Sequence, residues 1–242
     1  MGTPVLPSEM LICNQALSRM GSTQQISSFT DNSNEAMECA LWYPSMRDAM
    51  LSDFPWPWAE AYYSLNQVAG PETTLARANA QWLRSYRYPT DCLKMRRIVF
   101  IPPAITATLP QTTGTTGFNY MYNEPWRRAV GSATPISYGL GNDSTGKLIM
   151  TDFVSIYGLA AIYTQAVSDP AQFEPDFADA LTWRVAMEIS MGLGYDSKKR
   201  DFAAKEYAHA VKQARATAMN SIQSDIPYVE HQAEVIRRRW RA

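Results

Sequence analysis

Hydrophobic residues recur every three or four positions near the start of the chain, which predicts a helix over residues 8–20. The members of this stripe are Met10, Cys13, Leu17 and Met20. Ser8 can cap the first turn, and Gly21 supplies the stop. We therefore expect the helix to end at this glycine.

A second helical pattern begins near Asn32, where Asn32 and Glu35 have the spacing of a capping box. Its stripe contains Ala36, Cys39 or Ala40, Tyr43, Met46 or Arg47, and Met50. Pro44 lies inside this run and has no N–H to donate, so a kink or a break is expected there.

Three aromatic residues and two prolines then form a stiff corner, Asp53-Phe54-Pro55-Trp56-Pro57-Trp58. Prolines end the second helix, and Pro57 suits the first turn of a third helix, which we expect over residues 57–68. The two indoles can bury a large area between helices. The corner therefore predicts packing and no reaction chemistry.

The pattern changes after Gly70. Residues 71–90 are mixed, alternation predicts a strand around residues 98–101, and the Thr-, Pro- and Gly-rich residues 102–118 predict a long exposed loop. Further short strands are expected near residues 119–122, 126–130, 136–140 and 147–151. Periodicity leaves residues 153–168 open between a buried strand and a helix.

Helical spacing returns at the end of the chain. Pro175 suits a first turn, and Phe177, Leu181, Val185 and Ile189 follow at steps of four. A last helix is expected from residues 196–197 to about residue 222. It contains seven alanines between Ala203 and Ala218, which allow a neighbouring helix to approach closely.

Helices at both ends with strands between them predict an α+β fold. We expect residues 1–70 and 170–226 to form a helical bundle. Residues 71–169 would form an inserted antiparallel β module, and residues 227–242 would form a C-terminal arm.

Composition limits the class of protein. The chain has 242 residues, 46% of them hydrophobic, and a formal net charge of −1, which is typical of a globular protein and does not favour a general nucleic-acid binder. Its three cysteines, Cys13, Cys39 and Cys92, form no CxxC pair, so we expect buried free thiols in a reducing cytosol. We expect neither a signal peptide nor membrane association.

One segment, Gly141–Lys147, fits the GxxxxGK pattern of a phosphate-binding loop. Leu148 stands where such a loop needs Ser or Thr for magnesium, and the following residues read as a strand and not as a helix. We therefore predict a hairpin between residues 136–140 and 147–151, with no nucleotide cofactor.

The sequence supports no metal site, because its two histidines, His209 and His231, have no ligand at a typical spacing. Asp53 and Glu60 flank the tryptophan corner and would be the carboxylates of a glycosidase, with Glu174 and Asp176 as further candidates. Spacing alone shows no convergence among them. Asp176 is explained more simply by the positive end of its helix.

Four blocks of residues, in order, resemble one protein family. They are Asn14-Gln15-Ala16-Leu17 with Gly21 and Ile26; Asp31, Ala36, Cys39, Tyr43, Arg47, Asp48, Leu51 and Phe54-Pro55-Trp56 to Ala59; Trp82, Tyr86, Tyr88-Pro89 and Asp91-Cys92-Leu93; and Asp169-Pro170, Phe173, Pro175, Phe177, Ala180-Leu181 and Ala186, followed by Tyr207. The family is the head-to-tail adaptors of short-tailed phages, also called tail tubular protein A. The match covers about residues 8–220.

This resemblance implies a structural virion protein: a ring of about twelve copies, assembled in the host cytoplasm, that joins the portal to the tail nozzle. DNA would pass through the ring without sequence-specific binding. The resemblance implies no cofactor and no enzymatic activity.

The last residues form a basic tail in which Arg237, Arg238, Arg239 and Arg241 surround Trp240. Arginine and tryptophan are common at protein interfaces, so we expect this arm to bind a protein partner rather than DNA. In the family, the C-terminal extension reaches the portal, which implies the portal as that partner.

Two alternatives stay open at this stage. One is a virion-associated cell-wall hydrolase that uses carboxylates near the tryptophan corner, Asp53 and Glu60. The other is a DNA-binding module that uses the arginine tail.

Overall fold

The computed structural model describes residues 8–69, 82–100, 136–153 and 159–223. Within these residues the protein is α+β, with four α-helices and two small antiparallel sheets that are inserted between them in the sequence. One compact unit contains the helices, from residues 8–59 and 166–223, and a second contains the sheets, within residues 60–165. The predicted fold class is confirmed.

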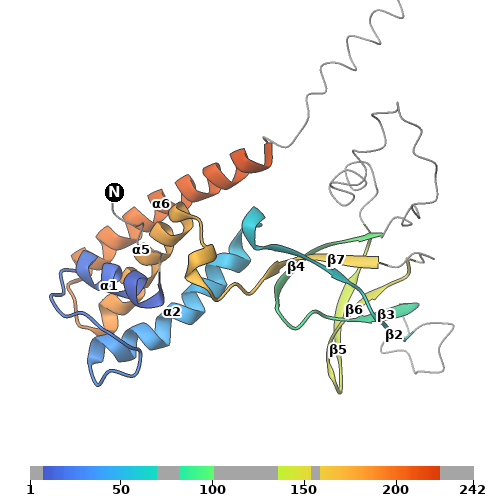
Figure 1. The fold of residues 1–242 in the computed structure, drawn as a ribbon, viewed down its shortest axis with the longest axis horizontal. Helices are drawn as coiled ribbons and strands as arrows, with labels where there is room; N and C mark the ends of the chain where they lie inside the picture. The colour runs from blue at the N-terminus through green and yellow to red at the C-terminus, as the bar shows by residue number, and fades with distance from the viewer. Residues whose placement is uncertain (1–7, 70–81, 101–135, 154–158, 224–242) are drawn as a thin grey trace, which may run out of the picture. The chain divides into compact units, whose positions relative to one another are not determined.

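The helical unit is built around α5. α1 (Glu9–Arg19), α2 (Asn34–Asp53) and α6 (Ser197–Gln223) all pack against α5 (Pro175–Gly192), so helices from both ends of the chain share one core (Figure 1). The buried residues of α5 include Phe177, Ala180, Leu181, Val185, Ala186 and Ile189. This set covers more than one face of the helix, because α5 has neighbours on several sides.

The ends of the first helices follow simple capping chemistry. Ser8 accepts a hydrogen bond from the Leu11 N–H at 3.1 Å, and Gly21 has a φ of +82°, as predicted for a cap and a stop. The predicted cap at Asn32 is wrong by one residue: Ser33 is the N-cap, and its hydroxyl accepts from the Ala36 N–H at 3.2 Å.

A kink or a break was predicted at Pro44, and the break does not occur, since α2 runs without interruption from Asn34 to Asp53. Pro44 is exposed, so its ring lies on the solvent side of the helix and the packed side continues past it. One backbone hydrogen bond is lost, and the buried residues on both sides of the proline hold the helix together.

The helix predicted over residues 57–68 is also wrong. Pro57–Ala59 form one 3-10 turn, η1, and the chain continues as β1 (Glu60–Ser64) and β2 (Gln67–Ala69). All five residues of β1 pair with β7 (Leu159–Gln165). This long-range pairing outweighs the weak helical spacing, and the adjacent Tyr62 and Tyr63 suit a strand.

The β unit consists of two antiparallel sheets. β1, β7 and β4 (Cys92–Phe100) form the first in that order, and β2, β3 (Arg84–Arg87), β6 (Gly146–Thr151) and β5 (Gly139–Asp143) form the second. Side chains from both sheets meet in one core, which includes Tyr86 and Ile149 from the second sheet with Met95, Ile98 and Tyr163 from the first.

The predictions for this region have mixed outcomes. The strand expected around residues 98–101 is confirmed as far as residue 100, where β4 ends. Residues 153–168, for which periodicity allowed either a strand or a helix, contain strand β7. The predicted loop at 102–118 and the strands near 119–122 and 126–130 lie outside the described residues. Among the described helices, none has the length and apolar character needed to cross a membrane.

Candidate functional site

The tryptophan corner is the packing centre of the helical unit, as predicted. Trp56 is 1% exposed, and its indole N–H donates to the carbonyl of Met50 at 2.9 Å. Its ring meets that of Phe177 edge-on with centroids 5.0 Å apart, and Trp58 meets the same phenylalanine at 5.0 Å. Edge-to-face aromatic contacts add specific geometry to the buried area. The corner therefore fixes α2 against α5.

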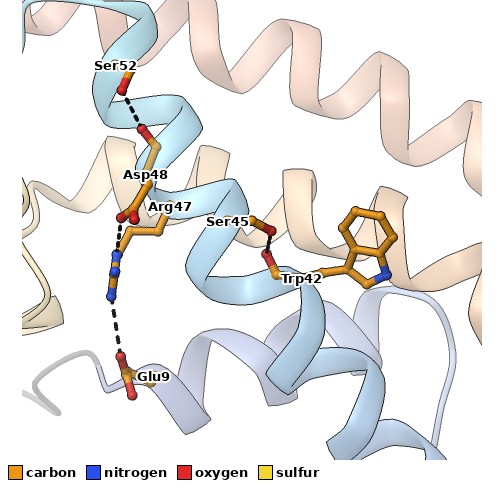
Figure 2. Close-up of polar contacts among 6 residues, drawn as sticks. All are labelled: Glu9, Trp42, Ser45, Arg47, Asp48 and Ser52. Atoms are coloured by element: carbon orange, nitrogen blue, oxygen red, sulfur yellow. Dashed lines mark hydrogen bonds and ion pairs between the residues drawn. The ribbon is translucent and has the colours of Figure 1, made fainter. Parts of the chain in front are cut away.

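A half-buried ionic network joins α1 to α2 (Figure 2). The side chain of Arg47 is only 13% exposed; its Nε donates to the Asp48 carboxylate at 2.8 Å, and its Nη1 lies 3.7 Å from the Glu9 carboxylate. The carboxylates of Glu9 and Asp48 compensate the charge of the Arg47 guanidinium, because a partly buried charge needs a partner of opposite sign. The network holds two helices together and presents no free acid or base.

Two thiols are buried at the same junction. Cys13 and Cys39 are both 0% exposed. The hydrogen bond to the Cys39 sulfur and burial raise the pKa of the Cys13 thiol far above its ordinary value. The Cys13 thiol therefore stays protonated and is a poor nucleophile and metal ligand. Cys13 and Cys39 are both free and buried, which confirms the predicted buried free thiols at these two positions. Cys92 is half-buried, and its S–H donates to the Tyr88 hydroxyl at 3.1 Å.

Residues that carry the family resemblance also have structural partners. The Asn14 side chain bonds the backbone of Ile26 twice, donating to its carbonyl at 2.9 Å and accepting from its N–H at 2.8 Å. Asp91 accepts from the Tyr163 hydroxyl at 2.9 Å. These contacts hold loops and strands in place. Sequence reasoning missed both contacts because each joins segments that the pattern does not connect.

The GxxxxGK segment forms a hairpin, as predicted, but its first strand lies at Gly139–Asp143 and not at residues 136–140. β5 and β6 pair up to Asp143 and Gly146, which leaves a two-residue turn. One carboxylate oxygen of Asp143 accepts from the N–H groups of Thr145 and Gly146, each at 2.8 Å, and from Arg87 at 2.9 Å. The backbone N–H groups of the turn are thus bound to the turn's own Asp143 carboxylate. In a phosphate-binding loop, such N–H groups bind the phosphate instead.

The bond from Arg87, together with those from Thr145, holds the pKa of the Asp143 carboxyl well below its ordinary value. This carboxylate is therefore ionised across the physiological range. It serves the turn as an acceptor for four donors: the two amides, the Thr145 hydroxyl and the Arg87 guanidinium.

The candidate carboxylates have separate surroundings. Asp53 is exposed at the end of α2, and Glu60, the first residue of β1, accepts from the Tyr62 hydroxyl at 2.7 Å. Asp176 lies in the first turn of α5, as predicted, and accepts from the Thr217 hydroxyl at 2.8 Å. Burial and the nearby Asp176 raise the pKa of Glu174.

The described residues contain no group of three or more His, Cys, Asp or Glu side chains that could hold a metal ion. His209 is exposed on α6. His231 and the predicted arm residues Arg237, Arg238, Arg239, Trp240 and Arg241 lie outside the described part of the chain.

An exposed apolar surface is the main feature that the sequence reasoning missed. Met37 and Leu41, one turn apart on α2, are 58% and 64% exposed, and Met191 near the end of α5 is 66% exposed. A Cβ at Gly192 would overlap the Glu38 carboxylate, so the end of α5 adjoins the first turns of α2. We use the name methionine–leucine surface for Met37 and Leu41 on α2 together with Met191 on the adjoining helix α5. Its only signal in the sequence is that Met37 and Leu41 fall between members of the buried stripe.

No protein-family model matches the chain, and no curated protein is significantly similar to it.

Proposed function

We propose that this chain is a non-enzymatic assembly protein: a head-to-tail adaptor that forms a ring of about twelve copies between the portal and the tail nozzle of a short-tailed phage. It would be assembled in the host cytoplasm and act in the virion, with DNA passing through the ring. The observation that carries the proposal is the methionine–leucine surface. Three large apolar side chains, each more than half exposed, stand in solvent on two adjoining helices; Phe202 and Met219 on α6 are exposed to a lesser extent.

An assembly role explains this exposure. Large apolar side chains gathered on one surface are typical of sites that a partner covers. In a closed ring each subunit presents one face to the neighbour before it and another to the neighbour after it. We propose that the methionine–leucine surface meets the next copy of the chain.

The architecture supports the same role. The residues that resemble the adaptor family form a rigid frame of aromatic packing, the Arg47 network and backbone bonds from side chains. A rigid frame suits a protein whose function is to present surfaces at fixed angles. The arm at residues 227–242 would bind the portal through Trp240 and the arginines around it.

Mixing the purified chain with portal rings tests the proposal. We expect a larger complex in which copies of this chain form a second ring, measured by mass photometry and electron microscopy. Removal of residues 229–242 should weaken that complex because it removes the arm. No complex with the full chain would contradict the adaptor role, whereas full binding by the truncated chain would contradict only the role of the arm.

A further inference from the structure

Lysine side chains line the solvent-facing side of α6. The buried side of this helix is made largely of alanine, with Ala203, Ala210, Ala214 and Ala218 among its members. On the opposite side three lysines recur every seven residues, with one histidine between the last two, and all four side chains are exposed. One carboxylate, the exposed Asp201, lies on the same side between the first two lysines. We call this set the lysine ridge: Lys198, Lys205, His209 and Lys212.

The three lysines lie on nearly the same side of the helix, because seven residues make almost two full turns. The chain as a whole has a net charge of −1, yet α6 carries six basic and two acidic side chains. Positive charge is therefore concentrated on this one element.

The charges of the ridge have no partner within the described residues, where Lys198, Lys205 and Lys212 form no ion pair. Two other basic residues of α6 are used by the fold. Lys199 donates to the carbonyl of Met20 at 2.7 Å, and the Arg215 guanidinium lies 5.7 Å from the centre of the Phe54 ring. The ridge is thus a row of charges that the fold leaves available, and Arg200 is exposed as well.

The reach of the lysines suits a phosphate backbone. Successive lysines are about 10 Å apart along the helix axis. Phosphates of one DNA strand rise by about 3.4 Å along the duplex axis and wind around it, so each lysine would contact whichever phosphate lies within its reach. Lysine acts toward phosphate as a point charge on a flexible stem and needs no fixed geometry.

A protein surface fits the ridge less well. Lysine is depleted in the cores of protein–protein interfaces, which are centred on aromatic and apolar anchors. Two aromatic residues of α6 flank the ridge in sequence. Tyr207 accepts from the Arg184 guanidinium at 2.9 Å, and Phe202 packs edge-on against Trp183 with ring centroids 5.9 Å apart, although it stays 54% exposed. The exposed Ala208 and Ala216 beside the ridge offer no anchor.

We infer that the lysine ridge binds the phosphate backbone of a nucleic-acid duplex without reading its sequence. The inference goes beyond the proposed function, since an adaptor ring needs no particular helix to contact nucleic acid. The inference rests on α6 alone and is tested with the chain by itself. The inference can therefore fail while the adaptor role holds, and the adaptor role can fail while the inference holds.

Fluorescence anisotropy with a labelled 20-base-pair DNA duplex tests the inference, with the full chain at salt concentrations from 50 to 200 mM. The variant is Lys205→Gln with Lys212→Gln, which keeps helix propensity and removes two charges. The matched control is Lys94→Gln with Arg97→Gln, which removes two charges from exposed positions on β4. A chain ending at Tyr228 separates the ridge from the arginine tail.

We expect the wild-type chain and the control to bind the duplex. The ridge variant should bind at least tenfold more weakly at 50 mM salt. Its plot of log affinity against log salt should be shallower by about 1.8, since each phosphate contact contributes about 0.9. The chain ending at Tyr228 should keep the difference between wild type and ridge variant.

Three results would overturn the inference: no binding by the wild type at 50 mM salt, an equal loss in the control, or loss of all binding on removal of the tail. A ridge variant that keeps its DNA affinity but loses affinity for portal rings would also overturn it. That result would make the ridge a protein interface.

Discussion

Trp56 is the largest fully buried side chain among the described residues, and it joins the end of α2 to α5. Replacing it with alanine removes the contact with Phe177 and leaves a cavity. We expect Trp56→Ala to lower the free energy of unfolding by about 3–5 kcal/mol, measured by urea denaturation. Trp42→Ala is the control. Because Trp42 is only half-buried, its replacement should lower the free energy of unfolding by clearly less. Equal losses would mean that the corner is not the packing centre.

Asp143 gives a second test at the level of one residue, through pH. Its pKa is lowered in the folded state, chiefly by Arg87, so its contribution to stability is complete above the ordinary carboxyl value of 3.8 and is lost as the pH falls toward the folded-state value. We expect Asp143→Asn to lower the melting temperature by a constant amount from pH 7 to about pH 4, and by less below that.

The control for this prediction is Asp201→Asn. Asp201 is exposed on α6 and forms no ion pair with any described residue. The Asp201→Asn substitution therefore removes one carboxylate without removing a hydrogen-bond acceptor from a turn. A pH-independent difference between Asp143→Asn and the wild type below pH 4 would contradict the role that we assign to the carboxylate.

At the scale of elements, α2 contains a defect that the fold tolerates. Pro44 cannot donate to the carbonyl of Ala40, although the helix continues past it. Because Pro44 is exposed, Pro44→Ala restores the missing bond without loss of packing, and we expect it to stabilise the protein by about 1–3 kcal/mol in thermal unfolding.

Ser45→Ala is a suitable control for this change. Ser45 is also exposed, and its hydroxyl donates to the Trp42 carbonyl at 3.0 Å within the same helix (Figure 2). Its replacement should alter stability by only a few tenths of a kcal/mol. A destabilised Pro44→Ala protein would show that the packing of α2 depends on a bend imposed by the proline.

Helices with a regular stripe and a clear end could be predicted from the sequence, as residues 8–20 and the run from Pro175 show. Local spacing failed after Pro57, because the partner of β1 lies about one hundred residues further along the chain. The same limit applies to the candidate site. The hairpin at Asp143 was predictable from a local pattern, whereas the exposure of Met37 and Leu41 depends on which side of α2 its neighbours cover.

At the scale of the whole molecule, the methionine–leucine surface should matter for assembly and not for folding. We expect Met37→Glu with Leu41→Glu to keep the melting temperature within about 2 °C, because exposed substitutions cost little. The same variant should weaken ring formation on the portal at least tenfold, because charge is placed where an apolar contact forms.

Leu140→Glu is the matched control for this surface. Leu140 lies on β5 and is 57% exposed, much like Met37. Mass photometry of portal complexes at several concentrations measures both variants. Assembly that is unaffected by the double variant, or reduced equally by the control, would remove the methionine–leucine surface from the interface.

The most direct test of the adaptor role is an electron cryomicroscopy map of the portal vertex in phage particles that contain this chain. The account predicts a ring of about twelve copies around the DNA exit channel, between the portal and the tail nozzle. Density for this chain away from that ring, or a single copy with a substrate held between carboxylates, would contradict the account.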